Sequence, residues 1–305
     1  MKEISVVVTT YMHGKYIREA IESVLKQTFK DFELIIIDDE SPDKTEEEVA
    51  KVKDKRIKYI RQNHSGLPAY TRNRGIEIAT GKLIALFDGD DIWHPNKLER
   101  CLEIFENNPA IDILCHDMSF FKSNDRKIFR RAYSGPYQDD MYKQLLLKGN
   151  ALSISSTVMK KSIFSEDRYS FSEDKRLFTV EDYDLWLRLA ESRKYRFFYL
   201  PDVLGMHRVF EDSASMINIK KNAINMLYLL DENVKELGFN EKSLMKIIKK
   251  RKSQVMLGAA LGFNYRKNFS ESMKWNFSAI KEYPLYLKPY LTFFASLIKI
   301  KLGYV

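Results

Sequence analysis

The chain has 305 residues, of which 45% are hydrophobic and 30% are charged, so it can form one large α/β domain with an appendage. Its two cysteines, Cys101 and Cys115, lie in apolar stretches, which disfavours a disulfide framework and favours a reducing compartment. We see no signal peptide before the strand-like run that begins at Ile4, and no apolar run reaches the ~18 residues that span a bilayer. A cytoplasmic protein is therefore expected.

The net charge of +8 is concentrated towards the C-terminal end. Residues 216–305 contain 16 Lys and Arg against 6 Asp and Glu, whereas residues 1–215 carry a net charge of −2. A basic tail of this kind suits an anionic surface such as a membrane or a polyanion. A solvated helix face explains the same pattern equally well.

Strand-like and helix-like segments alternate over the first 121 residues. Apolar runs predict strands at residues 4–10, 34–37, 57–60, 83–87 and 111–121. Helical spacing and helix-start signals predict helices that begin near Ile17, Thr45, Pro68 and Pro95. This alternation predicts an α/β fold whose mixed, mostly parallel sheet is covered by helices on both faces.

Polar residues cluster where three of the predicted strands end, at Thr9–Tyr11, Asp38–Asp39 and Asp88–Asp91. In sheets of this type ligands bind beyond the carboxyl ends of the strands. The sequence therefore predicts a ligand site at this edge of the sheet.

The segment Asp88-Gly-Asp-Asp91 places three carboxylates within four residues. Such carboxylates repel one another unless a cation lies among them, and hard oxygen ligands suit Mg²⁺ or Mn²⁺. An exposed acidic turn is the plain alternative. A calcium loop is disfavoured because no Glu follows at the EF-hand spacing.

Three further signals near this edge are compatible with a nucleotide. A carboxylate of Asp38 or Asp39 can accept a hydrogen bond from an imide N–H of uracil or thymine, although turn formation is an equal alternative. Tyr11 can stack on a base or belong to the core. Arg72, on the helix that begins at Pro68, suits diphosphate oxygens, although arginine on a helix is usually solvated.

An acidic helix start, Glu181-Asp182, precedes an amphipathic stretch that contains Trp186. Acidic residues in a first helical turn complement the helix dipole, but one of them can also act as a general base on an acceptor hydroxyl. His207 follows a strand-like run at residues 197–200 and is a candidate metal or diphosphate contact, although a lone histidine is more often structural.

Together these segments resemble glycosyltransferase family 2, whose members have the GT-A fold, a Rossmann-like nucleotide-binding fold. The resemblance covers residues 4 to about 215. It is carried, in order, by Ser5–Tyr11, Ala20–Thr28, Phe32–Asp39, Gly66–Gly75, Asp88–Asp91, Ser155–Met159 and Glu181–Trp186. One late motif departs from the family pattern, because Phe210 occupies the position of its usual histidine.

The resemblance implies a role for individual residues. Those that would hold the nucleotide-sugar are Thr9, Tyr11, Asp39, Arg72, Asp88 and Asp90. Asp90 and Asp91 would lie closest to a Mn²⁺ or Mg²⁺ ion, and Asp182 would be the general base. Asp38, Glu181 and His207 are further candidates.

The resemblance also implies an activity: inverting transfer of a sugar from a nucleotide-sugar, most simply a UDP-sugar, to a hydroxyl of a glycan or glycolipid acceptor in polysaccharide or glycolipid assembly. Residues 1–215 would form the catalytic domain, with a nucleotide-sugar part at 1–121 and an acceptor-side part at 122–215. Residues 216–305 would form a basic helical C-terminal region.

Four other classes of protein share parts of this pattern. A non-catalytic nucleotide-sugar or glycan-binding module could share the fold. A sugar nucleotidyltransferase would usually have a Gly-rich phosphate loop after the first strand, and Tyr11–Lys15 is not one. A dehydrogenase is disfavoured because no G-x-G-x-x-G follows a strand, and nucleic-acid binding is not expected because the catalytic part is slightly acidic.

The last stretch, residues 283–305, mixes aromatic and aliphatic residues with lysines. This composition fits an interfacial segment on the inner face of the cell membrane. A helix that packs on its own domain, or that forms a homo-oligomer, fits it equally well.

Overall fold

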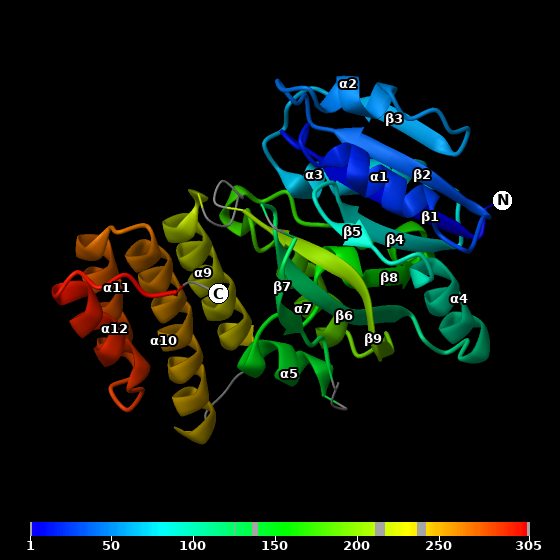
Figure 1. The fold of residues 1–305 in the computed structure, drawn as a ribbon. Helices are drawn as coiled ribbons and strands as arrows, with labels where there is room; N and C mark the ends of the chain where they lie inside the picture. The colour runs from blue at the N-terminus through cyan, green and yellow to red at the C-terminus, as the bar shows by residue number, and fades with distance from the viewer. Residues whose placement is uncertain (1, 125, 136–139, 211–216, 237–241, 304–305) are drawn as a thin grey trace. The chain divides into compact units, whose positions relative to one another are not determined.

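The computed structural model describes residues 2–124, 126–135, 140–210, 217–236 and 242–303 (Figure 1). The chain packs into two compact units. The first comprises Met1–Tyr142, Asn150–Lys175 and Glu181–Phe210, and the second comprises Lys143–Gly149, Arg176–Val180 and Glu211–Val305. The second unit therefore includes two short segments from the middle of the chain.

Nine strands form one sheet in the described part of the first unit. Their order is β3-β2-β1-β4-β8-β6-β9-β5, and β7 pairs with β6. The strands are β1 (Ile4–Thr10), β2 (Phe32–Asp38), β3 (Ile57–Arg61), β4 (Leu83–Asp88), β5 (Ile92–Trp93), β6 (Ile113–Lys122), β7 (Ile128–Ala132), β8 (Thr157–Lys160) and β9 (Phe197–Val209).

The first half of the sheet has the predicted alternating pattern. β1 pairs in parallel with both β2 and β4, and β2 pairs in parallel with β3. The connecting helices are α1 (Ile17–Leu25), α2 (Thr45–Ala50), α3 (Pro68–Ile78) and α4 (Lys97–Asn107). Because parallel neighbours end at the same edge, β1, β2 and β4 carry their last residues to a common rim.

The second half of the sheet is mixed. β8 is antiparallel to β4 and to β6, whereas β9 is parallel to β6. The short strand predicted at residues 197–200 is the start of β9, which continues to Val209. The β6–β9 register shifts on both sides of Asp117, which pairs with Val203. The first shift skips Pro201 and Asp202, where a proline without an N–H cannot join the ladder.

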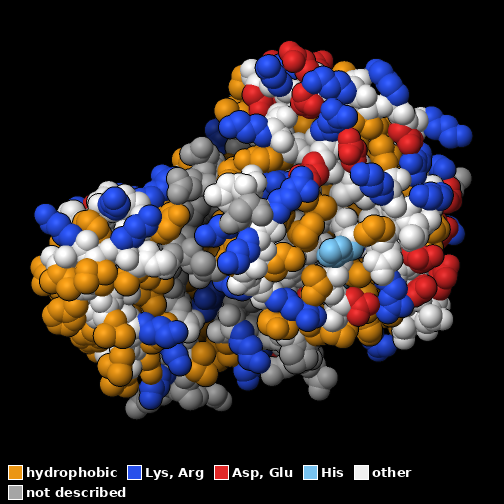
Figure 2. Space-filling view, in the orientation of Figure 1, with side chains coloured by type: hydrophobic (Ala, Val, Ile, Leu, Met, Phe, Trp, Pro, Cys, Tyr) orange, Lys and Arg blue, Asp and Glu red, His pale blue; other side chains and the backbone are white. Residues whose placement is uncertain are grey.

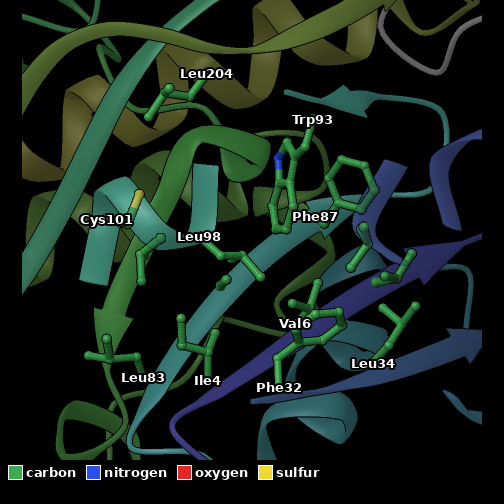
Figure 3. Close-up of a cluster of buried hydrophobic side chains, with 14 of the residues drawn as sticks. Ile4, Val6, Phe32, Leu34, Leu83, Phe87, Trp93, Leu98, Cys101 and Leu204 are labelled. Carbon is green, nitrogen blue, oxygen red and sulfur yellow. The ribbon is translucent and has the colours of Figure 1, made fainter. Parts of the chain in front are cut away.

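The apolar core of the first unit lies between the sheet and its helices (Figure 3). β1 and β2 are buried almost along their whole length, as expected for central strands covered on both faces. Helix α3 approaches β1 so closely that a Cβ on Gly75 would lie 2.4 Å from Val7 Cγ1. This close packing fixes the position of α3 beside the sheet.

The remaining α-helices of the described chain are α5 (Met141–Lys148), α6 (Ser162–Ser165), α7 (Glu181–Glu191), α9 (Ile219–Glu236), α10 (Lys242–Tyr265), α11 (Phe269–Glu282) and α12 (Lys288–Leu297). Two short 3-10 helices, η1 (Ile154–Ser156) and η2 (Lys175–Leu177), precede β8 and α7. The second unit is built mainly from α9 to α12. Among the helices that the structure describes, none has the length and apolar character that a bilayer crossing requires.

Candidate active site

The register of the parallel strands brings the predicted polar residues to one rim. Thr9 is the neighbour of Asp88 across β1 and β4, and Thr10 is the neighbour of Asp38 across β1 and β2. Thr9 Oγ1 lies 3.5 Å from Asp88 Oδ1. The sequence prediction that these strand ends share an edge therefore agrees with the observed register.

Arg72 connects this rim to the acidic start of α7. Its guanidinium is buried and donates from Nη2 to Asp88 Oδ1 at 3.2 Å and from Nη1 to Glu181 Oε1 at 2.5 Å. Burial alone would lower the pKa of Arg72, but the carboxylates of Asp88, Glu181 and Asp182 raise it above its ordinary value. Arg72 therefore stays charged and holds two acidic segments together.

Asp182 occupies a half-buried position in the first turn of α7. Its carboxylate accepts a hydrogen bond from Asn150 Nδ2 at 3.1 Å and from the Tyr183 N–H at 2.6 Å. Burial, followed by the charge of Glu181, raises the pKa of Asp182 to about 7. A partly accessible carboxylate that titrates near neutral pH suits general-base chemistry.

Asp90 is the acidic residue of this group with the fewest partners. Its Oδ2 lies 4.0 Å from His13 Nε2, and its carboxylate accepts no hydrogen bond from the residues that the structure describes. Burial, together with the charges of Asp91 and Asp88, raises the pKa of Asp90 to about 6. This carboxylate would be stabilised by a cation.

In Asp91, by contrast, both carboxylate oxygens have partners. It is 1% exposed, accepts a hydrogen bond from the Arg208 N–H at 3.0 Å, and contacts His207 Nδ1 at 3.1 Å. Burial alone would lower the pKa of His207, but Asp91 raises it to about 9. The pair has the arrangement in which a carboxylate orients a histidine by one ring nitrogen and leaves the other available.

These residues fit a divalent cation that also binds a ligand. In the described ranges, no group of three or more His, Cys, Asp and Glu is arranged to hold a metal ion by itself. The carboxylate of Asp90 is nevertheless a hard oxygen ligand that accepts no hydrogen bond from the described residues, and it interacts electrostatically with His13, Asp91, Asp88 and His207. Mg²⁺ is usually held by one or two carboxylates together with substrate phosphates, and this donor set suits that mode.

Asp39 and Tyr11 form a second cluster at the end of β2. Asp39 accepts hydrogen bonds from Gln62 Nε2 at 2.8 Å, from Ser65 N at 2.9 Å and from Gly66 N at 3.0 Å. Burial would raise the pKa of Asp39, but these hydrogen bonds lower it below its ordinary value. Asp39 therefore organises the loop between β3 and α3.

The same loop carries His64, whose ring stacks on Tyr11 with 4.5 Å between centroids. His64 Nδ1 lies 2.9 Å from Asp39 Oδ2, so the three side chains are connected. Asp38 is fully buried and accepts hydrogen bonds from Ser41 and from the Tyr59 hydroxyl at 2.6 Å. These contacts explain Asp38 as a structural carboxylate.

The structure thus joins most of the predicted site residues through direct contacts or through their charges. That connected group consists of Thr9, Arg72, Asp88, Asp90, Asp91, Glu181, Asp182 and His207. Asp39 and Tyr11 lie on the same rim but contact the loop that carries His64. Sequence reasoning did not find His13, His64 or Asn150, because each lies in a segment without a recognisable pattern.

A sheet edge at which parallel strands collect carboxylates, together with a buried arginine that bridges two of them, is typical of α/β enzymes that bind nucleotides. The chain belongs to the family described as Glycosyl transferase family 2, whose sequence profile matches residues 5–168. It is accordingly a glycosyltransferase, as the sequence resemblance implied.

Two relatives illustrate the family relationship. Over 231 residues the chain is 33% identical to an uncharacterized glycosyltransferase of Methanocaldococcus jannaschii, a match that covers 74% of this chain and 78% of the relative. Over 221 residues it is 28% identical to the UDP-Glc:alpha-D-GlcNAc-diphosphoundecaprenol beta-1,3-glucosyltransferase WfgD of Escherichia coli. This match covers 72% of this chain and 81% of the relative. Matches to relatives in Nostoc and Rickettsia conorii span 47% and 38% of those proteins.

Solved structures confirm the GT-A fold. S. aureus TarS 1-349 in complex with UDP-GlcNAc matches with a TM-score of 0.63 at 20% identity, covering 98% of this chain and 88% of that one. The mannosyltransferase PcManGT from Pyrobaculum calidifontis, in complex with GDP-Man and Mn²⁺, matches with a TM-score of 0.60 at 16% identity. This match covers 98% of this chain and 86% of that one. At these identities the likeness supports the fold alone.

Proposed function

We infer that this glycosyltransferase transfers a sugar from a UDP-sugar to a hydroxyl of a glycan or glycolipid acceptor, with inversion at the anomeric carbon. The observation that carries the proposal is the position of Asp182. Its partly exposed carboxylate is linked through Glu181 and Arg72 to Asp88 at the rim where β1 and β4 end. The choice of UDP is supported by the named activity of the E. coli relative.

In the proposed reaction, Asp182 accepts the proton of the acceptor hydroxyl as its oxygen attacks the anomeric carbon. The new glycosidic bond forms on the face opposite the breaking bond to the diphosphate, so a single displacement inverts the centre. UDP leaves with the electron pair of that bond. Because both Nη groups of Arg72 are engaged with Asp88 and Glu181, we assign it a positioning role rather than direct phosphate contact.

A divalent ion, when bound, would neutralise charge that develops on the leaving diphosphate. Asp90 is the first candidate ligand because its carboxylate accepts no hydrogen bond from the described residues, and His207 is the second. Asp91 is proposed to orient His207, since both oxygens of Asp91 already have partners. Thr9, Tyr11 and Asp39 remain the residues proposed for the base and ribose.

The experiment that tests this function measures transfer and donor binding by an Asp182→Asn variant. We expect turnover to fall by ~10²–10⁴-fold while UDP-sugar affinity is retained, because only the base is removed. Asp184→Asn is the matched control, since Asp184 lies in the same helical turn and pairs with Arg188. Near-normal turnover in Asp182→Asn would show that Asp182 is not the general base. If the wild-type protein binds the UDP-sugar but transfers no sugar, a non-catalytic binding module is favoured instead.

The metal proposal is tested by titrating UDP into the protein with Mn²⁺ and then with excess EDTA. We expect chelation to weaken UDP binding by at least about tenfold, because the diphosphate charge is no longer neutralised. Asp90→Asn should reproduce this loss in the presence of Mn²⁺. Equal affinity with and without the chelator would refute the metal assignment.

A further inference from the structure

The helices α10, α11 and α12 pack against one another through small and polar side chains. Their nearly inaccessible polar residues are Ser253, Asn264, Ser272, Asn276, Thr292 and Ser296, each at most 5% exposed. Two alanines, Ala260 and Ala279, are fully buried between the same helices. Small and polar side chains therefore make up much of the interior of this three-helix layer, although α10 also buries Leu244, Ile248 and Leu257.

Hydrogen bonds between the helices join these small and polar side chains. Ser272 Oγ lies 2.8 Å from Ser296 Oγ and donates to Ala260 O at 2.7 Å. Asn264 Nδ2 donates to Ser296 Oγ at 3.0 Å, and Ser253 Oγ donates to Ala279 O at 2.8 Å. These bonds connect α10, α11 and α12 in pairs.

Large apolar side chains of α12 and its flanks point outwards instead. On α12 and its flanks, Leu287, Leu291, Phe294 and Ile298 recur at helical spacing and are 59–72% exposed. Figure 2 shows hydrophobic side chains gathered over this part of the unit. We define the outer apolar face as these four residues together with Phe277, Leu285 and Leu297, which are 54–71% exposed.

This arrangement is the reverse of a helix that packs in water, which buries its large apolar stripe and exposes its polar residues. It is the arrangement of helices in lipid, where small residues and Ser, Thr and Asn form the helix contacts and large apolar residues face the hydrocarbon. A buried interface with a second protein would explain the outer face but would not explain the polar interior. The polar interior therefore favours a lipid over a protein partner.

The charges around the outer apolar face specify the kind of lipid surface. Residues 277–303 contain Lys281, Lys288, Lys299 and Lys301, all exposed, against one acidic residue, Glu282. The ten residues of α12 are about 15 Å long, which is half the thickness of a bilayer core. A short apolar helix flanked by lysines lies in the interface and binds anionic headgroups.

We propose that the outer apolar face of α11 and α12 docks on an anionic bilayer surface, with the four lysines at the level of the headgroups. This membrane-binding site is additional to the proposed transfer reaction and does not rest on it. Of the interpretations that the sequence of residues 283–305 left open, the proposal selects the interfacial segment over a packed or oligomerising helix.

The experiment is flotation of the whole protein with vesicles of phosphatidylcholine, with and without about one-third phosphatidylglycerol. We expect the wild type to float with the anionic vesicles. Leu291→Glu/Phe294→Glu should lower the partition coefficient at least about tenfold, because two inserted apolar side chains become charged. Lys288→Gln/Lys299→Gln should reduce binding to anionic vesicles several-fold, by about the contribution of two surface charges.

The matched control is Ile128→Glu/Tyr133→Glu, which changes two exposed apolar residues of the first unit by the same charge. It should float like the wild type, and circular dichroism should show that all variants are folded. Equal flotation of Leu291→Glu/Phe294→Glu and wild type would overturn the proposal, as would failure of the wild type to float. A dimer in solution that Leu291→Glu/Phe294→Glu dissociates would also overturn it, because a second copy would then cover the face.

Discussion

Arg72 determines how two acidic segments remain close to each other. Its guanidinium spans Asp88 and Glu181, and its Nε is buried with no hydrogen-bond partner in the described ranges. Lysine keeps the charge but cannot offer two donors in a planar fork. We expect Arg72→Lys to reduce kcat/KM by about 10²-fold or more, because a single ammonium group cannot bridge both carboxylates and leaves one of them without its buried partner.

The control for this substitution lies on the same helix. Arg74 is exposed and pairs with Glu77 at 2.7 Å, so Arg74→Lys should leave kcat/KM within about twofold. Steady-state kinetics of both variants, with thermal melting to confirm folding, provide the measurement. If Arg72→Lys were as active as Arg74→Lys, the positioning role of Arg72 would be wrong.

The pKa of Asp182 sets a second prediction at this scale. A general base works only when ionised, and the pKa of this carboxyl is raised to about 7 by burial and by Glu181. The value of kcat/KM should therefore rise with pH through about 7 and reach a plateau above it. Glu181→Gln removes the neighbouring negative charge and should move this inflection to lower pH; an unchanged pH profile would contradict the assignment.

Sequence reasoning found the acidic residues because they follow apolar strands or begin an amphipathic helix, and both patterns are local. It could not show that the adjacent residues Asp90 and Asp91 differ in their hydrogen bonds. The carboxylate of Asp91 accepts one from the Arg208 N–H, whereas that of Asp90 accepts none from the described residues. That difference arises from Arg208 and His207 on β9, more than one hundred residues away in sequence. Contacts of this kind carry no signal in either segment alone.

At the scale of single elements, α4 begins with an unusual residue. Lys97 is fully buried, its Nζ lies 3.5 Å from the centroid of the Trp93 ring, and no described residue accepts a hydrogen bond from it. A cation at a helix N-terminus also opposes the helix dipole. Burial lowers the pKa of Lys97 to about 8, so its charged form destabilises the fold at neutral pH.

We expect Lys97→Met to raise the free energy of unfolding at pH 7 by about 1–3 kcal/mol, since a buried unpaired charge is removed. Between pH 8 and the unfolded pKa of about 10.4, the unfolded wild type holds a proton that the folded state has lost. The free energy of unfolding of the wild type should therefore increase relative to that of Lys97→Met as the pH rises through this window. Urea unfolding at pH 7 and 9.5 measures both effects.

The exposed Lys55 provides a control, because Lys55→Met should change stability by less than about 0.5 kcal/mol. Destabilisation by Lys97→Met at pH 7 would show that the contact with Trp93 outweighs the burial of the charge. The helix itself was predicted from sequence through Pro95, but the burial of its first lysine was not.

Most elements of the first half of the sheet were predictable because parallel strands buried on both faces read as continuous apolar runs. The strand at residues 4–10 was predicted to the residue. The mixed half was harder, since β9 continues through Pro201 and is stabilised by pairing with β6 rather than by its own pattern. Only long-range pairing reveals such a strand.

At the scale of the whole molecule, the helical unit takes in the five residues that precede the acidic start of α7. The segment Arg176–Val180 packs in that unit, and Glu181 follows it directly in the chain. Asn225 of α9 donates to Phe178 O at 2.7 Å, and Lys221 Nζ lies 4.1 Å from the centroid of the Phe178 ring. This connection could not be predicted from the sequence, because 47 residues separate Asn225 from Phe178 and neither segment carries a signal for the other.

This anchoring leads to the last prediction. Asn225 is buried, and Asn225→Ala removes the hydrogen bond that holds Phe178, worth about 0.5–1.5 kcal/mol. Because the loosened segment precedes Glu181 and Asp182, kcat should fall by about 2–10-fold while donor KM is unchanged. Asn233→Ala, which removes the hydrogen bond from Asn233 Nδ2 to Leu229 O on the same helix, is the control. A loss of kcat matched by Asn233→Ala would mean that general destabilisation of the helix, and not the anchor at Phe178, controls the rate.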